Sequence, residues 1–420
     1  MPKRTFPIDT PAKRVLLLAL AVASVIAAGL IMKWSLGNTI SARSEHVEVA
    51  DLAAGLAPSD PQSHFAAGIL RERTLEPADA ELALREFETA AGLSPNNYLI
   101  WLAVARVREA SGDRGGAETA LRRARDLAPN YSRVRWAYGN VLLRQGKPDE
   151  AFAEMRAAAA ADPAYAQPLI AAADQFYDGD ALLVREAAGD TPAVAAALSL
   201  RSASEGKFDE ALEVWRELGP DQKTAAAATG TAVLNKMIEA KKYVPAAELA
   251  NILVGSSRYE VGAIYDGGFE NGISMQNAGP FGWRIADGPQ PQVALTDGQR
   301  HSGAYSLLMI FRGAAGGDLR SISQTIAAVP GQRYALEGFY RSDLKSQARI
   351  KWQIAAPDGR VIGSTDPFAS SSDWAQFFSE FSVPPDSDGV TIALVRDACP
   401  APCTIAGNLW FDDVSVRAVR

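Results

Sequence analysis

Three stretches of the chain repeat one pattern at a spacing of 34 residues: ALREFETAAGLSP (Ala83–Pro95), AETALRRARDLAP (Ala117–Pro129) and AFAEMRAAAAADP (Ala151–Pro163). In each, alanine occupies the first and eighth positions, a large apolar residue the fifth, and proline the last. Gly112 and Gly146 precede the second and third stretches at equal distance. The pattern predicts a repeated helix-turn-helix unit, because small residues let two helices approach, glycine suits the turn and proline ends the preceding helix.

Two further positions extend this register: an aromatic residue, Trp101, in the middle unit and a small residue, Gly139, in the third. With them, the segment Gln62–Ala164 resembles three tetratricopeptide repeats in register. The resemblance implies an α-solenoid whose concave groove binds protein segments. The alternative is a spacer that holds a distal domain away from the membrane. The core positions of the repeat are the same in both cases.

Helix-pair patterns continue beyond the regular repeats, although the register slips. GKFDEA (Gly206–Ala211), followed by Trp215, predicts one further unit, and KYVPA (Lys242–Ala246) predicts another. Their distance from the regular repeats is not a multiple of 34, so residues 167–197 are predicted to hold a shortened unit. We therefore predict five or six repeats in a solenoid domain over residues 61–255.

The amino-terminal region carries an uncharged run of 18 residues, Val15–Met32. As a helix it would be about 27 Å long, close to the thickness of a bilayer core. Four cations precede it against one acid, Asp9, so the positive-inside rule places the short tail in the cytoplasm. The sequence thus predicts a cytoplasmic tail (1–14), a transmembrane helix (15–34), a linker (35–60) and a carboxy-terminal bulk in the periplasm or outside the cell.

The segment has two alternatives to a membrane anchor. A cleaved signal peptide could use the small residues Ala21–Ala23, but cleavage there would leave an apolar stub, Ser24–Met32. A buried core helix is disfavoured because the segment is apolar on every face. An uncleaved anchor is the preferred interpretation, and the body of the chain is extracytoplasmic under either membrane signal.

The two cysteines lie four positions apart in a short loop that contains two prolines, Cys399-Pro-Ala-Pro-Cys403. In an oxidising compartment Cys399 and Cys403 are predicted to form a disulfide, and two free thiols are the alternative. The spacing excludes a CxxC redox motif.

Composition changes near Gly255, where the alanine-rich helical pattern stops and apolar residues begin to alternate with polar ones. Clear alternation occurs in RYALEGFY (Arg333–Tyr340), RIKWQI (Arg349–Ile354) and LWFDDVSV (Leu409–Val416). Turn sequences such as VPGQ, PDGR and DSDG separate the runs. Short alternating strands over about 160 residues predict an all-β sandwich or jelly roll.

An ordered series of short motifs makes this region more specific: GGFENG (Gly267–Gly272), HSGAYSL (His301–Leu307), SQTI (Ser323–Ile326) and WFDDVSV (Trp410–Val416). In this order they resemble the jelly-roll carbohydrate-binding modules of families 4 and 9, over Tyr265–Val419. We therefore predict a module of this type at residues 256–420. The resemblance implies glycan binding on an aromatic and polar surface.

The same resemblance implies a structural Ca²⁺ near the domain ends, at Glu270 and Asp412. Asp412 alternates with Val414 and Val416, which predicts that its carboxylate points inward and needs a partner. The alternative partner is a set of backbone N–H groups or an arginine.

Residues off the predicted apolar strand faces are the candidates for glycan contact, because sugars need planar hydrogen-bonding groups and an aromatic platform. A solvated sheet face is the alternative for each of them. Trp283, Trp352 and Trp374 are predicted to be packing residues. The candidates are Glu337, Phe339, Arg341, Arg349, Lys351, Gln353, Gln376, Phe378 and Glu380.

Charge and motif content exclude several function classes. The 420-residue chain has 42 Lys and Arg against 49 Asp and Glu, a net charge of −7, which is unfavourable for nucleic-acid binding. Three histidines and two cysteines cannot supply a four-ligand structural zinc site here. The chain has neither a G-x-S-x-G elbow nor a phosphate-binding P-loop, and we predict that it is not an enzyme.

These observations predict a multidomain protein, α then β: a transmembrane helix, a tetratricopeptide solenoid and a jelly-roll sandwich. The leading hypothesis is a non-catalytic scaffold in the inner membrane of a bacterium. Its repeats would bind protein partners and its jelly roll a polysaccharide during exopolysaccharide assembly or export. The alternatives are an interaction scaffold with a structural jelly roll, and a glycan hydrolase or lyase.

Overall fold

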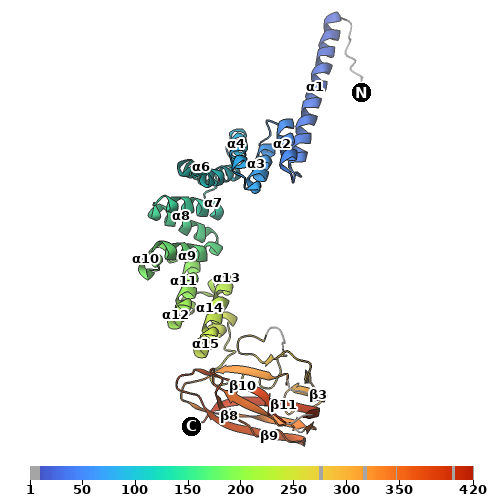
Figure 1. The fold of residues 1–420 in the computed structure, drawn as a ribbon, viewed down its shortest axis with the longest axis vertical. Helices are drawn as coiled ribbons and strands as arrows, with labels where there is room; N and C mark the ends of the chain where they lie inside the picture. Colours follow the sequence, from blue (N-terminus) through green and yellow to red (C-terminus); the bar gives the residue numbers. More distant parts are fainter. Residues whose placement is uncertain (1–9, 274–277, 316–318, 347, 400–402, 420) are drawn as a thin grey trace, which may run out of the picture. The chain divides into compact units, whose positions relative to one another are not determined.

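A computed structural model describes residues 10–273, 278–315, 319–346, 348–399 and 403–419 (Figure 1). The chain divides into two compact units, Met1–Val194 and Ala195–Arg420. The first unit is helical, and the second contains further helices and a β-sandwich. Each unit is described by itself.

The first unit begins with helix α1 (Pro11–Ser41), which is long and apolar enough to cross a membrane. The side chains of its most apolar window are all exposed, so α1 is not a core helix of the part of the chain described here. A membrane anchor and a signal sequence both meet this description. Helix α1 is also longer than the predicted span of residues 15–34.

Residues 35–60, treated above as a linker, are largely helical. They comprise the carboxy-terminal turns of α1 and helix α2 (Val47–Leu56), which pack together. A Cβ at Gly37 of α1 would lie 2.7 Å from the Cβ of Ala57 and 2.8 Å from the carbonyl oxygen of Ala53. The Asp60 carboxylate then accepts hydrogen bonds from the backbone N–H of Ser63 (3.0 Å) and from Asn38 Nδ2 (3.1 Å). This segment joins α1 to the first repeat by side-chain contacts.

The three regular repeats form as predicted, each as a pair of consecutive helices. The pairs are α3 (Pro61–Thr74) with α4 (Pro77–Leu93), α5 (Tyr98–Ala110) with α6 (Arg114–Leu127), and α7 (Ser132–Arg144) with α8 (Pro148–Ala161). Every alanine of the predicted pattern is buried, as are Phe87, Leu121 and Met155 at its large position. Gly112 and Gly146 have positive φ in the turns, where a side chain would be strained.

The irregular repeats follow as shorter helices. A 3-10 turn, η1 (Pro163–Tyr165), leads into the short pair α9 (Ala166–Phe176) and α10 (Ala181–Ala188), where a shortened unit was predicted. The later helices are α11 (Pro192–Ser204), α12 (Phe208–Glu217), α13 (Pro220–Ala225), α14 (Ala227–Glu239) and α15 (Tyr243–Val254). Trp215 of α12 is buried, and its Nε1 donates to Ser199 Oγ at 2.9 Å.

The β-sandwich consists of two antiparallel sheets, in the orders β1-β4-β10-β7-β8 and β2-β3-β11-β5-β9, with β6 beside β11. We call them the first and the second sheet. The strands are β1 (Arg284–Ile285), β2 (Gln292–Thr296), β3 (Ser306–Ala315), β4 (Ile322–Ala327), β5 (Arg333–Ser342), β6 (Lys345–Ser346), β7 (Ile350–Ala355), β8 (Val361–Ser364), β9 (Ser371–Ser382), β10 (Gly389–Arg396) and β11 (Thr404–Ala418). Trp352 and Phe411, one from each sheet, meet in the core at 5.0 Å between ring centroids.

The sandwich shares a core with the helices of its own unit. Asp388, before β10, accepts hydrogen bonds from the backbone N–H of Tyr243 (2.9 Å) and Val244 (3.2 Å), and so caps the amino terminus of α15. Tyr259 and Phe281 are buried in one cluster with residues of α12 and α15. The sandwich and these helices are therefore one packed body, and a fragment cut at residue 256 would divide its core.

Candidate functional site

The outer face of the second sheet carries the principal candidate site. In β5, Tyr334 and Leu336 are buried in the sandwich core, so Glu337, Phe339 and Arg341 point outward. In β9, Phe377 is buried likewise and its neighbour Phe378 is 52% exposed. Six predicted glycan residues thus share this face: Glu337, Phe339, Arg341, Gln376, Phe378 and Glu380. We refer to it as the outer face.

Aromatic rings form the centre of the outer face. The His301 ring stacks on Phe339, with ring centroids 3.7 Å apart and planes 14° apart. Trp374 meets the same His301 ring edge-on at 5.9 Å. His301 Nδ1 lies 2.6 Å from Asp413 Oδ2, and this contact holds the ring in place. The cluster offers a flat apolar surface with polar edges, which suits the apolar face of a pyranose ring.

A second aromatic position lies one row away. Trp410 of β11 pairs with Arg341 of β5 and with Leu308 of β3, so the three side chains form one row on the outer face. Arg341 Nη1 donates to Gln299 Oε1 at 2.6 Å. The row therefore places an indole ring beside a guanidinium whose hydrogen-bond partner is neutral.

The remaining predicted glycan residues lie elsewhere. Lys351 and Gln353 point outward from β7, which belongs to the first sheet, and Arg349 directly precedes that strand. Lys351 is engaged in an ion pair with Asp397 at 2.9 Å. The alternation of β7 was interpreted correctly, since Ile350 and Trp352 are buried. The nine candidates therefore do not form one surface, because β5 and β7 are in opposite sheets.

Paired charges occupy the other end of the outer face. Arg417 donates to Glu337 at 2.7 Å, and Arg333 pairs with Glu380. Both pairs are solvent-accessible and bring opposite charges together. These two carboxylates are therefore already engaged by arginines of the same domain.

The two acids predicted to hold calcium are surrounded by N–H donors. Asp412 is fully buried and accepts from the backbone N–H of His301 (2.7 Å), Ser302 (3.1 Å) and Asp413 (2.8 Å). Burial raises the pKa of Asp412 above its ordinary value, and these hydrogen bonds oppose that shift. Glu270 Oε1 accepts from the backbone N–H of Ala304 at 2.9 Å.

Donor hydrogens point at both carboxylates, whereas calcium takes six to eight oxygen ligands. Across the described ranges, no group of three or more His, Cys, Asp or Glu side chains could hold a metal ion. The residues present thus do not fit a calcium ion shared by Glu270 and Asp412. Backbone N–H groups bind both carboxylates instead, which is the alternative that the sequence left open.

The predicted inward direction of Asp412 is wrong, because β11 contains a bulge. Asp412 pairs with Phe339, an outward residue, whereas Val416 pairs with the buried Leu336. The register shifts between Asp412 and Ser415, and Asp413 has a positive φ of 50°. Asp412 is buried on the outer side by the loop that contains His301, and this loop is thereby tied to the sheet.

At the end of β10, the structure joins Cys399 and Cys403 through their sulfur atoms. Arg396 donates to the carbonyl oxygen of Cys403 at 2.6 Å. Residues 400–402 between the cysteines lie outside the described residues. The bond lies in the connection between β10 and β11.

The helical repeats of the first unit contain a groove of about 230 Å³ between α5 and α7. Its lining is mixed, and two of its arginines are already paired: Arg106 with Glu72 and Arg144 with Glu109. The full lining is Leu102, Ala105, Arg106, Glu109, Leu121, Arg133, Ala137, Asn140 and Arg144. The groove is open to a peptide segment and has polar groups that could orient one.

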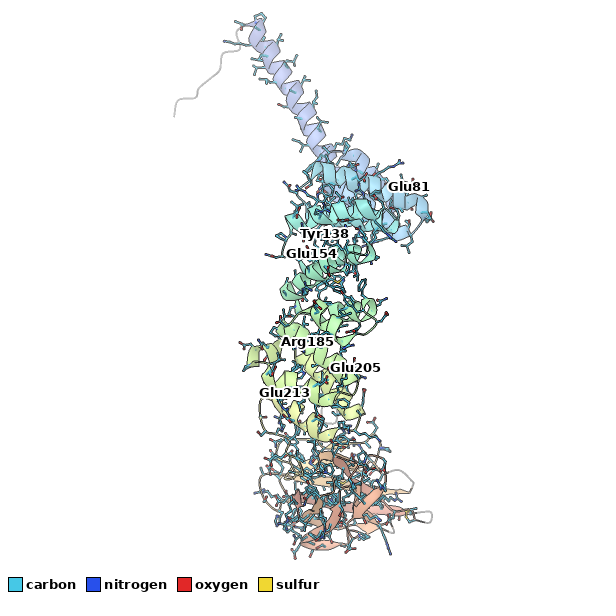
Figure 2. The ribbon with its side chains drawn as sticks, turned by 90° about the vertical axis from the view of Figure 1, so that its left-hand side faces the viewer. Glu81, Tyr138, Glu154, Arg185, Glu205 and Glu213 are labelled. Carbon is cyan, nitrogen blue, oxygen red and sulfur yellow. A yellow bond between two sulfur atoms is a disulfide. The ribbon has the colours of Figure 1, made fainter. Side chains whose placement is uncertain are left out.

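Charged contacts on the neighbouring surface connect consecutive repeats. Glu154 of α8 receives Arg125 of α6 at 3.1 Å and Arg135 of α7 at 2.7 Å. The Arg125 guanidinium also lies 5.4 Å from the ring centroid of Tyr138. Figure 2 labels Tyr138 and Glu154, which lie close together on the α7–α8 pair. These contacts stabilise the stacking of the repeats.

Sequence reasoning missed three residues of the outer face: His301, Trp374 and Trp410. Alternation could have found Trp410, because the buried Phe411 directly follows it. Trp374 was expected to be a packing residue but is partly exposed beside His301, whereas Trp283 and Trp352 are buried as expected. His301 comes from a loop, and its position depends on the distant Asp413.

A family model and several solved structures resemble parts of this chain. A family model described as Carbohydrate binding domain (CBM 4/9) matches residues 261–399. No curated protein sequence matches the chain. A solved family 4 module, "CBM4 structure and function", is 18% identical, with a TM-score of 0.29, and covers 37% of this chain and 99% of that one. MamA 41-end from Desulfovibrio magneticus RS-1 is 18% identical, with a TM-score of 0.33, and covers 44% of this chain and 96% of that one. By the family model, the carboxy-terminal sandwich is a carbohydrate-binding domain of the CBM 4/9 family, and in the fold it follows a region of helical repeats.

Proposed function

We propose that this protein is a non-catalytic, membrane-anchored scaffold that holds a polysaccharide on the outer face of its sandwich and a protein partner in its repeat groove. The observation that carries the proposal is the stacked cluster of Phe339, His301 and Trp374 on a domain of a carbohydrate-binding family. Sugar recognition combines such a ring platform with polar edges.

Two aromatic positions give the outer face room for more than one sugar. The Phe339 cluster and Trp410 belong to neighbouring rows, and rows of outward residues are spaced by about 7 Å. Gln376, opposite Phe339, and Arg341, opposite Trp410, supply hydrogen-bonding groups beside the rings. A chain of sugars could contact both rows at once.

The membrane and the partner complete the proposal. Helix α1 acts as an uncleaved anchor with its amino terminus in the cytoplasm, which places the sandwich in the periplasm or outside the cell. The groove between α5 and α7 binds a protein segment. A scaffold that links a membrane, a protein and a polysaccharide suits exopolysaccharide assembly or export.

The proposal is tested with the full chain in detergent micelles on an array of bacterial and plant glycans. The double variant Phe339→Ala and Trp410→Ala should weaken the binding of every bound glycan by roughly tenfold or more, since stacked aromatics contribute strongly to sugar contacts.

The matched control is Lys351→Ala with Gln353→Ala, which alters the outer side of the first sheet and should leave binding unchanged. A control variant that loses binding as strongly would move the site to the first sheet. A full chain that binds no glycan would refute the function.

A further inference from the structure

We propose that the polysaccharide is acidic and that Arg341 pairs with a sugar carboxylate beside Trp410. This inference rests on the proposed function, because it uses the same outer face and adds the chemical class of its ligand. It is carried by cations of that face for which the described residues supply no carboxylate partner.

Three cations lie along the outer face beside the aromatic rows. Arg341 is on β5, Arg312 on β3 and Lys345 on β6. Arg312 and Lys345 both pair with Ala406 of β11, so they flank one row on the outward side. The row that contains Arg341 and Trp410 lies four residues further along β11, about 14 Å from the row at Ala406.

Among the described residues, no ion pair joins any of these three cations to a carboxylate. Arg341 bonds the neutral amide oxygen of Gln299. The arginines at the opposite end of the face differ, since Arg417 pairs with Glu337 and Arg333 with Glu380. The positive charge that remains available is therefore concentrated at one end.

Two of the acids near this end, Asp343 and Asp413, are already held by the protein. Asp343 accepts from the backbone N–H of Asn408 at 2.5 Å and from Asn408 Nδ2 at 3.0 Å. Asp413 is bound by His301 and by Ser302 Oγ at 2.7 Å. With Asp413 held by His301 and Ser302, the three cations outnumber Asp343 and the exposed Asp373 of β9, so this end is net positive and a glycan with carboxylates would supply the complementary charge.

Arg341 is suited to a carboxylate because of its geometry. It is only partly exposed, and its bond to Gln299 orients the guanidinium, while further N–H donors stay available. A planar guanidinium binds a carboxylate through two parallel hydrogen bonds. When the ring of a uronic acid stacks on Trp410, the carboxylate of that sugar would be directed to the neighbouring strand β5, which carries Arg341.

The test compares acidic oligosaccharides with their neutral counterparts on the full chain in detergent micelles. The probes are hexamers of galacturonate and of mannuronate, each also after chemical reduction of its carboxyl groups to neutral sugars. Calorimetry should show at least one acidic hexamer bound roughly tenfold or more tightly than its reduced form. Binding of that hexamer should weaken as salt is raised.

Variants then assign the effect to the outer face. Arg341→Gln should lower affinity for the acidic hexamer roughly tenfold and leave affinity for the reduced hexamer unchanged. Arg312→Gln with Lys345→Gln should act in the same direction. Arg349→Gln is the control, since it removes the same charge beside the first sheet. Trp410→Ala should weaken both forms, because it acts on the ring and not on the charge.

The outcomes separate this inference from the proposed function. Reduced hexamers or neutral glycans that bind as tightly as the acidic ones, with Arg341→Gln silent, would overturn the acidic ligand and leave polysaccharide binding in place. Absence of binding to any glycan, charged or neutral, would overturn both. Acid selectivity that survives Arg341→Gln but is lost in Arg349→Gln would move the site away from the outer face.

Discussion

Helices α7 and α8 are in close contact at Gly139, so one added methyl group there should measurably destabilise this helix pair. A Cβ at this position would lie 2.7 Å from Met155 Cγ and 2.9 Å from the carbonyl oxygen of Ala151. Met155 is fully buried and the carbonyl belongs to the backbone of α8, so the two helices must separate to relieve the contact. Overpacking of this kind costs about 1–3 kcal/mol.

Gly139→Ala alone would combine this cost with a gain, because alanine favours the helix over glycine by about 1 kcal/mol. Gly92→Ala is the matched control. Gly92 lies within α4, and a Cβ there would meet no atom within 4 Å. The propensity gain at Gly92, one residue before the end of α4, is at most that at Gly139 in the interior of α7, so the difference between the variants is a lower bound on the cost of the contact. We expect Gly92→Ala to stabilise its helix pair and Gly139→Ala to fall about 1–3 kcal/mol below it.

Hydrogen exchange followed by mass spectrometry on the full chain in micelles measures the opening of each helix pair separately. The expected difference of about 1–3 kcal/mol corresponds to a roughly 5- to 150-fold change in amide exchange rate. Peptides of α7 and α8 in Gly139→Ala should therefore exchange faster by this factor than they would if the variant gained the same stability as Gly92→Ala. Equal protection in the two variants would show that Gly139 does not lie at a close helix contact, and the register of the third repeat would be refuted.

Three further predictions concern single carboxylates. Asp388→Ala removes the cap of α15 and should destabilise the second unit by about 0.5–2 kcal/mol. A melting curve of the full chain measures this change. Unchanged melting would refute the conclusion that the helices and the sandwich form one packed body. EDTA should leave the melting of the sandwich unchanged, because three backbone N–H groups already bind the Asp412 carboxylate. A calcium ion bound to the folded state alone would instead raise its stability by about 2.7 kcal/mol at a hundredfold excess over Kd. Burial raises the pKa of Asp60, but hydrogen bonds from Ser63 and Asn38 outweigh it and hold that pKa below its ordinary 3.8. The stability that the Asp60 carboxylate contributes is therefore present above pH 3.8 and is lost as pH falls through the folded-state pKa. Asp60→Asn should lower stability near neutral pH and flatten the acid limb of the stability curve. A pH dependence of stability identical to that of the wild type would contradict the role of this carboxylate.

Local spacing alone determined the helical repeats. The 34-residue period could be interpreted because each repeat buries its own alanines against its partner helix, so the pattern along the chain is the pattern of the core. The same holds for the strands, where Leu336 and Trp352 are buried as alternation predicted. Both inferences need only neighbours in sequence.

Only the tertiary structure decided which strand faces belong together. Phe339 and Lys351 both point outward, as alternation predicted, but β5 and β7 belong to opposite sheets and the residues cannot contact one ligand surface. One additional residue at the β11 bulge reversed the expected direction of Asp412. Alternation counts residues within a strand, and it contains no information about sheet membership or about a bulge.

Long-range partners were likewise beyond the reach of the sequence. His301 is positioned by Asp413, and α15 is capped by Asp388, which follows it by more than 100 residues. The segment 35–60 was expected to be a linker, yet α2 packs its small residues on the end of α1. Each of these features depends on a contact between distant parts of the chain, and such contacts form only when the hydrophobic cores bring those parts together.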